Sequence, residues 1–243
     1  MSDNVSKTEC FGCLNPLGLP IPKGQIDNLL DSSQIDPSID MLRLSLNDFF
    51  GPTPWNSRIF LERYDRVSAP EDYIPFMPYE SEIVANIIMP LISAKRMFCI
   101  GEFIASIGLC GIVSEMLAVL IWELNKDNVK IKGIEISSKN ETVLFGKDMQ
   151  SQGQKKRIQI LRELGFVDQV VFDYFDQVRE ERNRFLHLWD ITIKINEEEK
   201  AEESLKNIIL LAQKVFDIKT ENGKPYFNQA ITDYLQKKKL SKP

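Results

Sequence analysis

The sequence feature that most restricts the fold is a run of twenty residues, Phe103 to Trp122, with one charged side chain, Glu115. A helix of this length and composition can cross a bilayer or form the buried centre of a bundle. An ionised carboxylate is costly in lipid, and basic residues do not flank the run on one side only. Gly108 and Gly111 would also let a neighbouring helix approach closely. We therefore expect a core helix of a bundle, with membrane insertion as the second interpretation.

Helical periodicity continues along most of the remaining chain. It predicts helices over residues 81–97, 101–125, 154–164, 167–189, 197–216 and 226–240. The first should kink at Pro90, which has no amide donor. The connection over residues 126–152 contains an alternating segment, 129–136, that fits a short strand or an extended loop. These elements predict an all-α fold, arranged as a helical bundle.

The first third of the chain has a different character. Ten of the twelve prolines lie at or before Pro90, and residues 1–37 are also rich in Gly, Ser, Asn and Asp. Apolar spacing still predicts two short helices, Ile39–Phe50 and Trp55–Val67. We expect a loop-rich extension over residues 1–78, followed by a helical domain over residues 79–243.

The charge balance argues against a broad nucleic-acid-coating surface, because 30 basic and 35 acidic side chains give a net charge of −5. Residues 126–157 are an exception, since they carry a local net charge of +4. This segment is either a solvated loop or a small site for RNA. The basic side chains with which it would bind RNA include Lys155, Lys156 and Arg157.

The four cysteines are too few and too scattered for a disulfide framework, and the first residues contain no apolar signal core. Both observations favour a reducing cytoplasm. Cys10 and Cys13 have the spacing of half a zinc site, but no second pair follows, and the single histidine is far away. We expect no metal and no cofactor.

The predicted helix over residues 167–189 carries the one histidine of the chain, within the segment Arg182–His187. Its apolar seam repeats every three or four residues, at Val171, Phe175, Val178, Arg182, Phe185 and Trp189. Arg182 is the one polar member, and a buried guanidinium requires a carboxylate or an anion as partner. Glu115 is the obvious partner. Taken alone, the pair could be a purely structural link between core helices.

His187 lies on a neighbouring stripe of the same helix, with Asp176, Glu180 and Asn183, because residues four apart share a face. Histidine titrates near neutral pH and can take and return a proton. One anion could touch Arg182, Asn183 and His187 together, especially across a two-fold axis. A phosphate is the natural candidate.

These residues resemble the HEPN superfamily. Arg182-Asn183, three residues and His187 match its Arg-x4-His motif, in which Asn or Asp commonly follows the Arg. The apolar helix with an embedded Glu, here Ile104 to Leu124 with Glu115, is similar to the family's upstream helix. The resemblance spans about residues 81–218.

The resemblance implies a HEPN-like bundle of four to five core helices that dimerises with the motif helices near the two-fold axis. Many members are metal-independent endoribonucleases that act as toxins or in defence, and they leave 2′,3′-cyclic phosphate ends. Carried onto this chain, His187 would move the proton, Arg182 would neutralise the phosphorane and Asn183 would orient the phosphate. Glu115 would hold Arg182 from behind, and Arg184 would add a weaker RNA contact.

One departure concerns partners. Members that pair with a nucleotidyltransferase antitoxin often have Tyr two residues after the His, whereas this chain has Trp189 and lacks that hydroxyl. The family also contains members that do not cut. The alternative function is therefore a non-catalytic module that binds a nucleotide, RNA or a protein partner. The expected partners are a second copy, RNA or a nucleotide, and a protein antitoxin or regulator, but no membrane.

Overall fold

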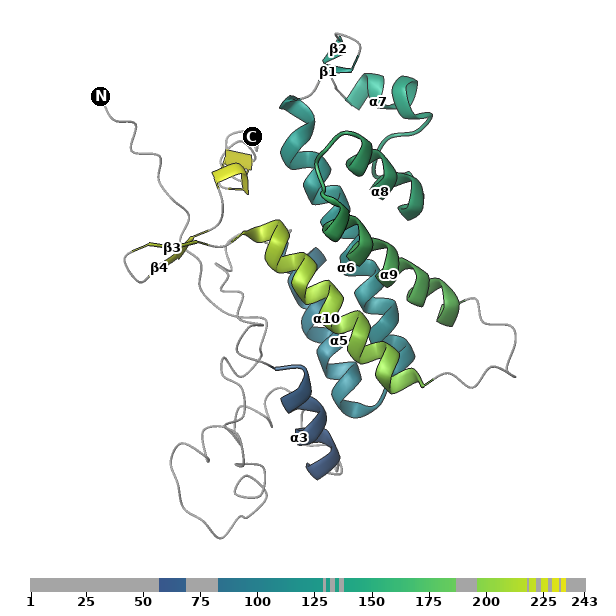
Figure 1. Ribbon diagram of the computed structural model, residues 1–243, viewed down its shortest axis with the longest axis vertical. Helices are drawn as coiled ribbons and strands as arrows, with labels where there is room; N and C mark the ends of the chain where they lie inside the picture. The colour runs from purple at the N-terminus through teal and green to yellow at the C-terminus, as the bar shows by residue number, and fades with distance from the viewer. Residues whose placement is uncertain are drawn as a thin grey trace.

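Four long helices form the centre of the fold (Figure 1). They are α5 (Met89–Ile100), α6 (Phe103–Asn125), α9 (Gln169–Leu186) and α10 (Glu197–Phe216). The computed structural model describes residues 57–68, 83–128, 130–131, 134–135, 138–186, 196–217, 219–221, 224–226, 229–231 and 233–234. Helix α6 contacts the other three long helices, and α9 also packs on α10. The expected all-α architecture is confirmed.

Helix α6 is the central element because it packs against α5, α9 and α10. Ile107, Cys110, Val113, Leu117 and Trp122 are fully buried. Its length and composition would suit a membrane span, yet 56% of its most apolar window is buried inside the bundle. The structure therefore gives this apolar run a place in the protein core, as expected for the central helix of a bundle.

The helix predicted over residues 81–97 is divided into a π-helical turn, η2 (Val84–Ile88), and α5, while the kink at Pro90 stays a prediction. Pro90 lies in the first turn of α5, where its missing amide hydrogen costs little. Gly101 ends α5 with a φ of 92°, a left-handed conformation that glycine adopts without strain. The chain then reverses into α6, so that α5 and α6 form an extensively packed helical hairpin.

The connection after α6 is more ordered than the sequence suggested. It contains the 3₁₀ turn η3 (Lys126–Asn128), an antiparallel pair β1 (Lys130–Ile131) and β2 (Ile134–Glu135), and helix α7 (Ser138–Phe145). Helix α7 was not predicted. Its Glu141 is buried and accepts hydrogen bonds from Trp122 Nε1 at 3.1 Å and from Met149 N at 3.0 Å. This long-range contact attaches α7 to α6. Helix α8 (Gln154–Glu163) follows, close to its predicted bounds.

Helix α3 (Ser57–Arg66) belongs to the same hydrophobic core as the bundle. Phe60, Leu61 and Tyr64 are at most 2% exposed, and α3 packs on α5. The sequence placed this segment in a separate extension, because its partners are far away in the chain. The predicted helix Ile39–Phe50 and the rest of residues 1–56 lie outside the described residues.

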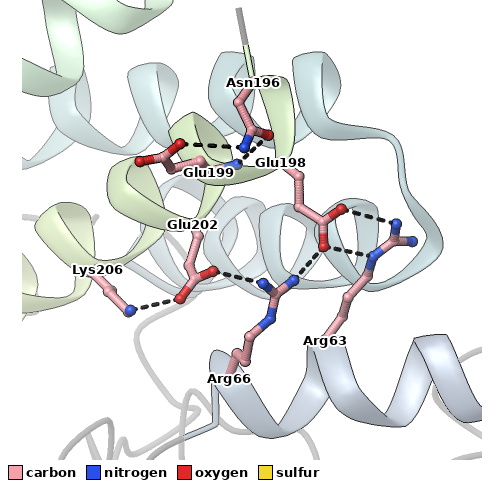
Figure 2. A network of polar contacts seen from close by, with 7 residues as sticks. All are labelled: Arg63, Arg66, Asn196, Glu198, Glu199, Glu202 and Lys206. Carbon is pink, nitrogen blue, oxygen red and sulfur yellow. Dashed lines mark hydrogen bonds and ion pairs between the residues drawn. The ribbon is translucent and has the colours of Figure 1, made fainter.

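Two arginines of α3 also bind the first turns of α10 (Figure 2). Arg63 donates to both carboxylate oxygens of Glu198, at 3.2 and 3.3 Å. Arg66 pairs with Glu198 and, at 3.1 Å, with Glu202. Their guanidinium groups also lie over the rings of Phe103 and Phe98, respectively. We call these four charged residues the α3–α10 cluster.

Helix α10 has the bounds that its sequence predicts, Glu197 to Phe216. The side chain of Asn196 caps it by accepting a hydrogen bond from Glu199 N at 3.2 Å. The helix ends at Asp217, which has a left-handed φ of 40°. An antiparallel ribbon follows, β3 (Lys219–Glu221) with β4 (Lys224–Tyr226), where the sequence had suggested only a helix end. Most of the predicted helix over residues 226–240 lies outside the described residues.

Candidate functional site

The seam of α9 packs into the core as its spacing predicts. Phe175 and Val178 are fully buried, and Val171 and Phe185 are at most 9% exposed. Arg182 continues this line toward the C-terminal end of the helix. Trp189, the last expected member, lies outside the described residues. The seam thus carries one polar side chain at the edge of an apolar contact.

Arg182 pairs with Glu115, and the predicted contact between these two residues is confirmed. The Nη1 atom of Arg182 donates to Oε1 of Glu115 across the α6–α9 interface. Each side chain is 28% exposed, so the pair lies at the surface end of the interface and remains accessible to solvent. An ion pair at such a position can still exchange contacts with a bound anion.

A second arginine, Arg157, is close enough to Glu115 for their charges to interact. Burial lowers the pKa of Arg157, and attraction by the charges of Glu115 and then Asp148 opposes this effect. Its side chain is 3% exposed, and all three of its nitrogen atoms donate hydrogen bonds. The acceptors are Met149 O at 3.0 Å, Gln154 Oε1 at 2.8 Å, Gln150 O at 2.9 Å and Gln152 O at 2.8 Å.

This arrangement corrects the expectation that Arg157 contacts RNA. Its donors already bind the loop before α8, so it holds that loop against α8 and is not on the basic surface. Gln154 extends the link, because its Nε2 donates to Ser114 Oγ at 3.2 Å. The sequence did not reveal this role, since Arg157 follows two exposed lysines in an outwardly similar basic run.

Three of the four residues expected to contribute weaker RNA contacts are exposed: Lys155, Lys156 and Arg184. Lys156 also donates to Phe145 O at 2.7 Å. Arg184 Nη1 lies 3.5 Å from Glu181 Oε1. These three cations stand on two different helices, and no contact among the described residues joins them to Arg182.

The stripe that precedes His187 is described as far as Asn183. Asp176 is half-buried and pairs with Arg179, whose Nη2 lies 2.6 Å from Asp176 Oδ1. Glu180 is exposed and Asn183 is half-buried. His187 lies outside the described residues, directly after the C-terminal end of α9 at Leu186. The structure thus positions the Arg and the Asn of the motif, while the place of His187 stays a prediction.

The described part of the chain also contains a cavity of about 300 Å³ near the opposite end of α9. Its lining is mainly apolar and includes Ile121, Phe166, Val171 and Val215. Three helical turns separate Val171 from Arg182, so the cavity and the ion pair are distinct features. The Arg182–Glu115 pair is partly exposed and does not line this cavity.

The thiols within the described residues, Cys99 and Cys110, are buried. Burial raises the pKa of Cys99 to about 12 and raises that of Cys110 further. Neither thiol is suited to nucleophilic chemistry at neutral pH. Across the described ranges, no group of three or more His, Cys, Asp or Glu side chains could hold a metal ion. Cys10 and Cys13 lie outside these ranges.

Comparisons with protein-family models, with curated proteins and with solved structures gave no match.

Proposed function

We propose that this chain is a HEPN-type endoribonuclease that cuts RNA without a metal ion, acting in the cytoplasm as a toxin or in defence. The observation that carries the proposal is the Arg182–Glu115 pair, held at a solvent-accessible edge of the bundle beside Asn183. His187 follows within two helical turns of Arg182 in the sequence. In this chemistry an imidazole can transfer the proton, and a cation and an amide can bind the phosphate.

In the proposed reaction, the 2′-hydroxyl of RNA attacks the adjacent phosphorus atom and the 5′-oxygen leaves. The hydroxyl loses its proton to a base, and the leaving oxygen gains one, so that a 2′,3′-cyclic phosphate and a 5′-hydroxyl result. His187 moves the proton, and Arg182 stabilises the negative charge that accumulates on the phosphorane oxygens. Asn183 orients the phosphate. Glu115 fixes the guanidinium of Arg182.

We further propose that two copies of the chain form the active enzyme. Ile104 and Ile112 are 42% and 44% exposed on α6, the helix that carries Glu115. They are eight residues apart and hence lie on the same side of the helix. Covering exposed apolar side chains in an interface is favourable. A second copy that covers them would bring two motif helices together.

The test is cleavage of labelled mixed-sequence RNA by the purified full chain in EDTA, beside the variant His187→Ala. We expect cutting by the wild type and a loss of about 100-fold or more in the variant. Circular dichroism and size-exclusion chromatography of both proteins control for folding and oligomeric state. If neither protein cuts and both retain RNA, the function is that of a binding module.

A further inference from the structure

Arg182 reaches Glu115 across a position where α6 has no side chain. A Cβ atom placed on Gly111 would lie 2.3 Å from Arg182 Cδ, 2.9 Å from Cγ and 3.1 Å from Nε. The first two distances are shorter than real Cβ contacts. The atoms concerned are in the middle of the arginine side chain, so a swing of its free end would not relieve the overlap.

Gly111 and Glu115 together define the path of this side chain. They are four residues apart and therefore lie on the same face of α6, one turn from each other. Gly111 makes room for the methylene groups, and Glu115 binds the guanidinium at the end of that path. A flexible arginine is in this way confined to one orientation, which lowers the entropy that it would lose when it binds an anion.

Within the part of the chain that the structure describes, the guanidinium of Arg182 retains donors for a ligand. Among the described residues, Nη1 is the atom of Arg182 that has an acceptor, namely Glu115 Oε1. The side chain is 28% exposed, and its planar group can present the other N–H donors to a phosphate.

We propose that Gly111 is a positioning residue of the anion site. Because Gly111 has no side chain, the stem of Arg182 can pass over it, and this path places the guanidinium where it binds the phosphate of RNA. The inference rests on the proposed function. It differs from a packing role for Gly111, in which any close approach of α6 and α9 would require glycine and Arg182 would be incidental.

The experiment compares Gly111→Ala with Gly108→Ala. Gly108 lies in the same helix, and a Cβ atom there would meet nothing within 4 Å, so this control adds the same methyl group without the overlap. Alanine has a higher helix propensity than glycine, so Gly108→Ala should melt at or above the wild-type temperature. We expect Gly111→Ala to melt about 3 °C or more below that control.

The decisive variant is Gly111→Ala combined with Arg182→Ala, which removes the arginine stem that passes over Gly111. We expect it to melt no lower than Arg182→Ala alone, because the overlap is gone. Should Gly111→Ala fail to fold, this comparison still tests the inference. A double variant that melts several degrees below Arg182→Ala would overturn it, as would equal melting temperatures for Gly111→Ala and Gly108→Ala.

The rate of RNA cleavage distinguishes a positioning role of Gly111 from a packing role. We expect Gly111→Ala to lose about as much activity as Arg182→Ala, on the order of 100-fold. Gly153→Ala adds a methyl group in open space before α8 and should keep wild-type activity. The double variant should be no slower than Arg182→Ala, since both changes disable one group. Additive losses, or full activity in Gly111→Ala, would overturn the proposal. If the wild type does not cut RNA, the proposed function fails, whereas the melting temperatures still decide how Arg182 uses Gly111.

Discussion

Arginines contact glutamates in two regions of this molecule, and the two arrangements differ in how many contacts each guanidinium group makes. In the α3–α10 cluster, Arg63 and Arg66 face Glu198 and Glu202 (Figure 2). Both guanidinium groups also cover aromatic rings. At the α6–α9 interface, Arg182 meets Glu115 through one nitrogen atom. The same residue types thus form a shared network of several contacts in one place and a single pair in the other.

The comparison indicates different roles. A network in which each arginine binds carboxylates through two nitrogen atoms and also covers a ring stabilises the contact between two helices. A single pair, in which the other donors of Arg182 have no acceptor among the described residues, contributes less to stability and more to recognition of an anion. We therefore assign attachment of α3 to the first region and propose phosphate binding for the second.

The largest expected effect is on the rate of RNA cleavage, and it should differ between the two regions. Arg182→Ala should lower the rate of RNA cleavage by about 100-fold, because a transition-state charge loses its main cation. Arg66→Ala removes the same kind of side chain from the α3–α10 cluster and should leave the rate within about threefold of the wild type. Single-turnover cleavage of one labelled RNA measures both. Equal losses in the two variants would contradict the assignment.

The second effect concerns stability. Replacing both Arg63 and Arg66 with Ala should lower the free energy of unfolding by about 2 kcal/mol, as several ion pairs and two ring contacts disappear together. Urea denaturation followed by circular dichroism would measure this loss. Glu62→Ala in the same helix is the control, since its pair with Arg58 is exposed and spans 4.0 Å. A double variant as stable as this control would show that the cluster does not attach α3.

The smallest effect depends on pH. Hydrogen bonds from Arg63, and then from Arg66, hold the pKa of Glu198 below its ordinary value of 4.5. A lowered carboxyl pKa stabilises the fold at pH values above 4.5, and this stabilisation is lost as the pH falls through the folded-state pKa. Glu198→Gln should therefore cost about 1 kcal/mol at pH 7, discounted for solvent screening, and nothing in strong acid.

Urea midpoints of wild type and Glu198→Gln, measured between pH 7 and pH 3, follow this change. The difference between their urea midpoints should stay constant from neutral pH to about pH 5 and then disappear at lower pH. A difference that increases on acidification would mean that Glu198 is not stabilised as a carboxylate.

Short-range patterns in the sequence predicted a large part of this fold. The bounds of α10 agree with its apolar spacing, and the seam of α9 is buried as its repeat requires. The contact between Arg182 and Glu115 was also predictable, because each is the single charged residue on an apolar surface that must find a partner. These features depend on periodicity and on the cost of burying a charge.

The features that the sequence did not reveal depend on contacts between distant segments. Helix α7 is attached through Glu141 and Trp122, which are 19 residues apart in the chain. Arg157 looked like a member of an exposed basic run, and only the fold shows that it binds the loop before α8. Helix α3 joins the core through α5 and α10, more than twenty residues further along. The position of His187 stays a prediction from the motif.

The measurement that tests the central claim most directly is the chemical identity of the RNA ends that the full chain produces in EDTA. The account predicts 2′,3′-cyclic phosphates and 5′-hydroxyls, with no cutting at a position where the substrate carries 2′-deoxyribose. Ends with a 5′-phosphate and a 3′-hydroxyl, or cutting that persists at the deoxyribose position, would contradict attack by the 2′-hydroxyl and with it the role assigned to Arg182.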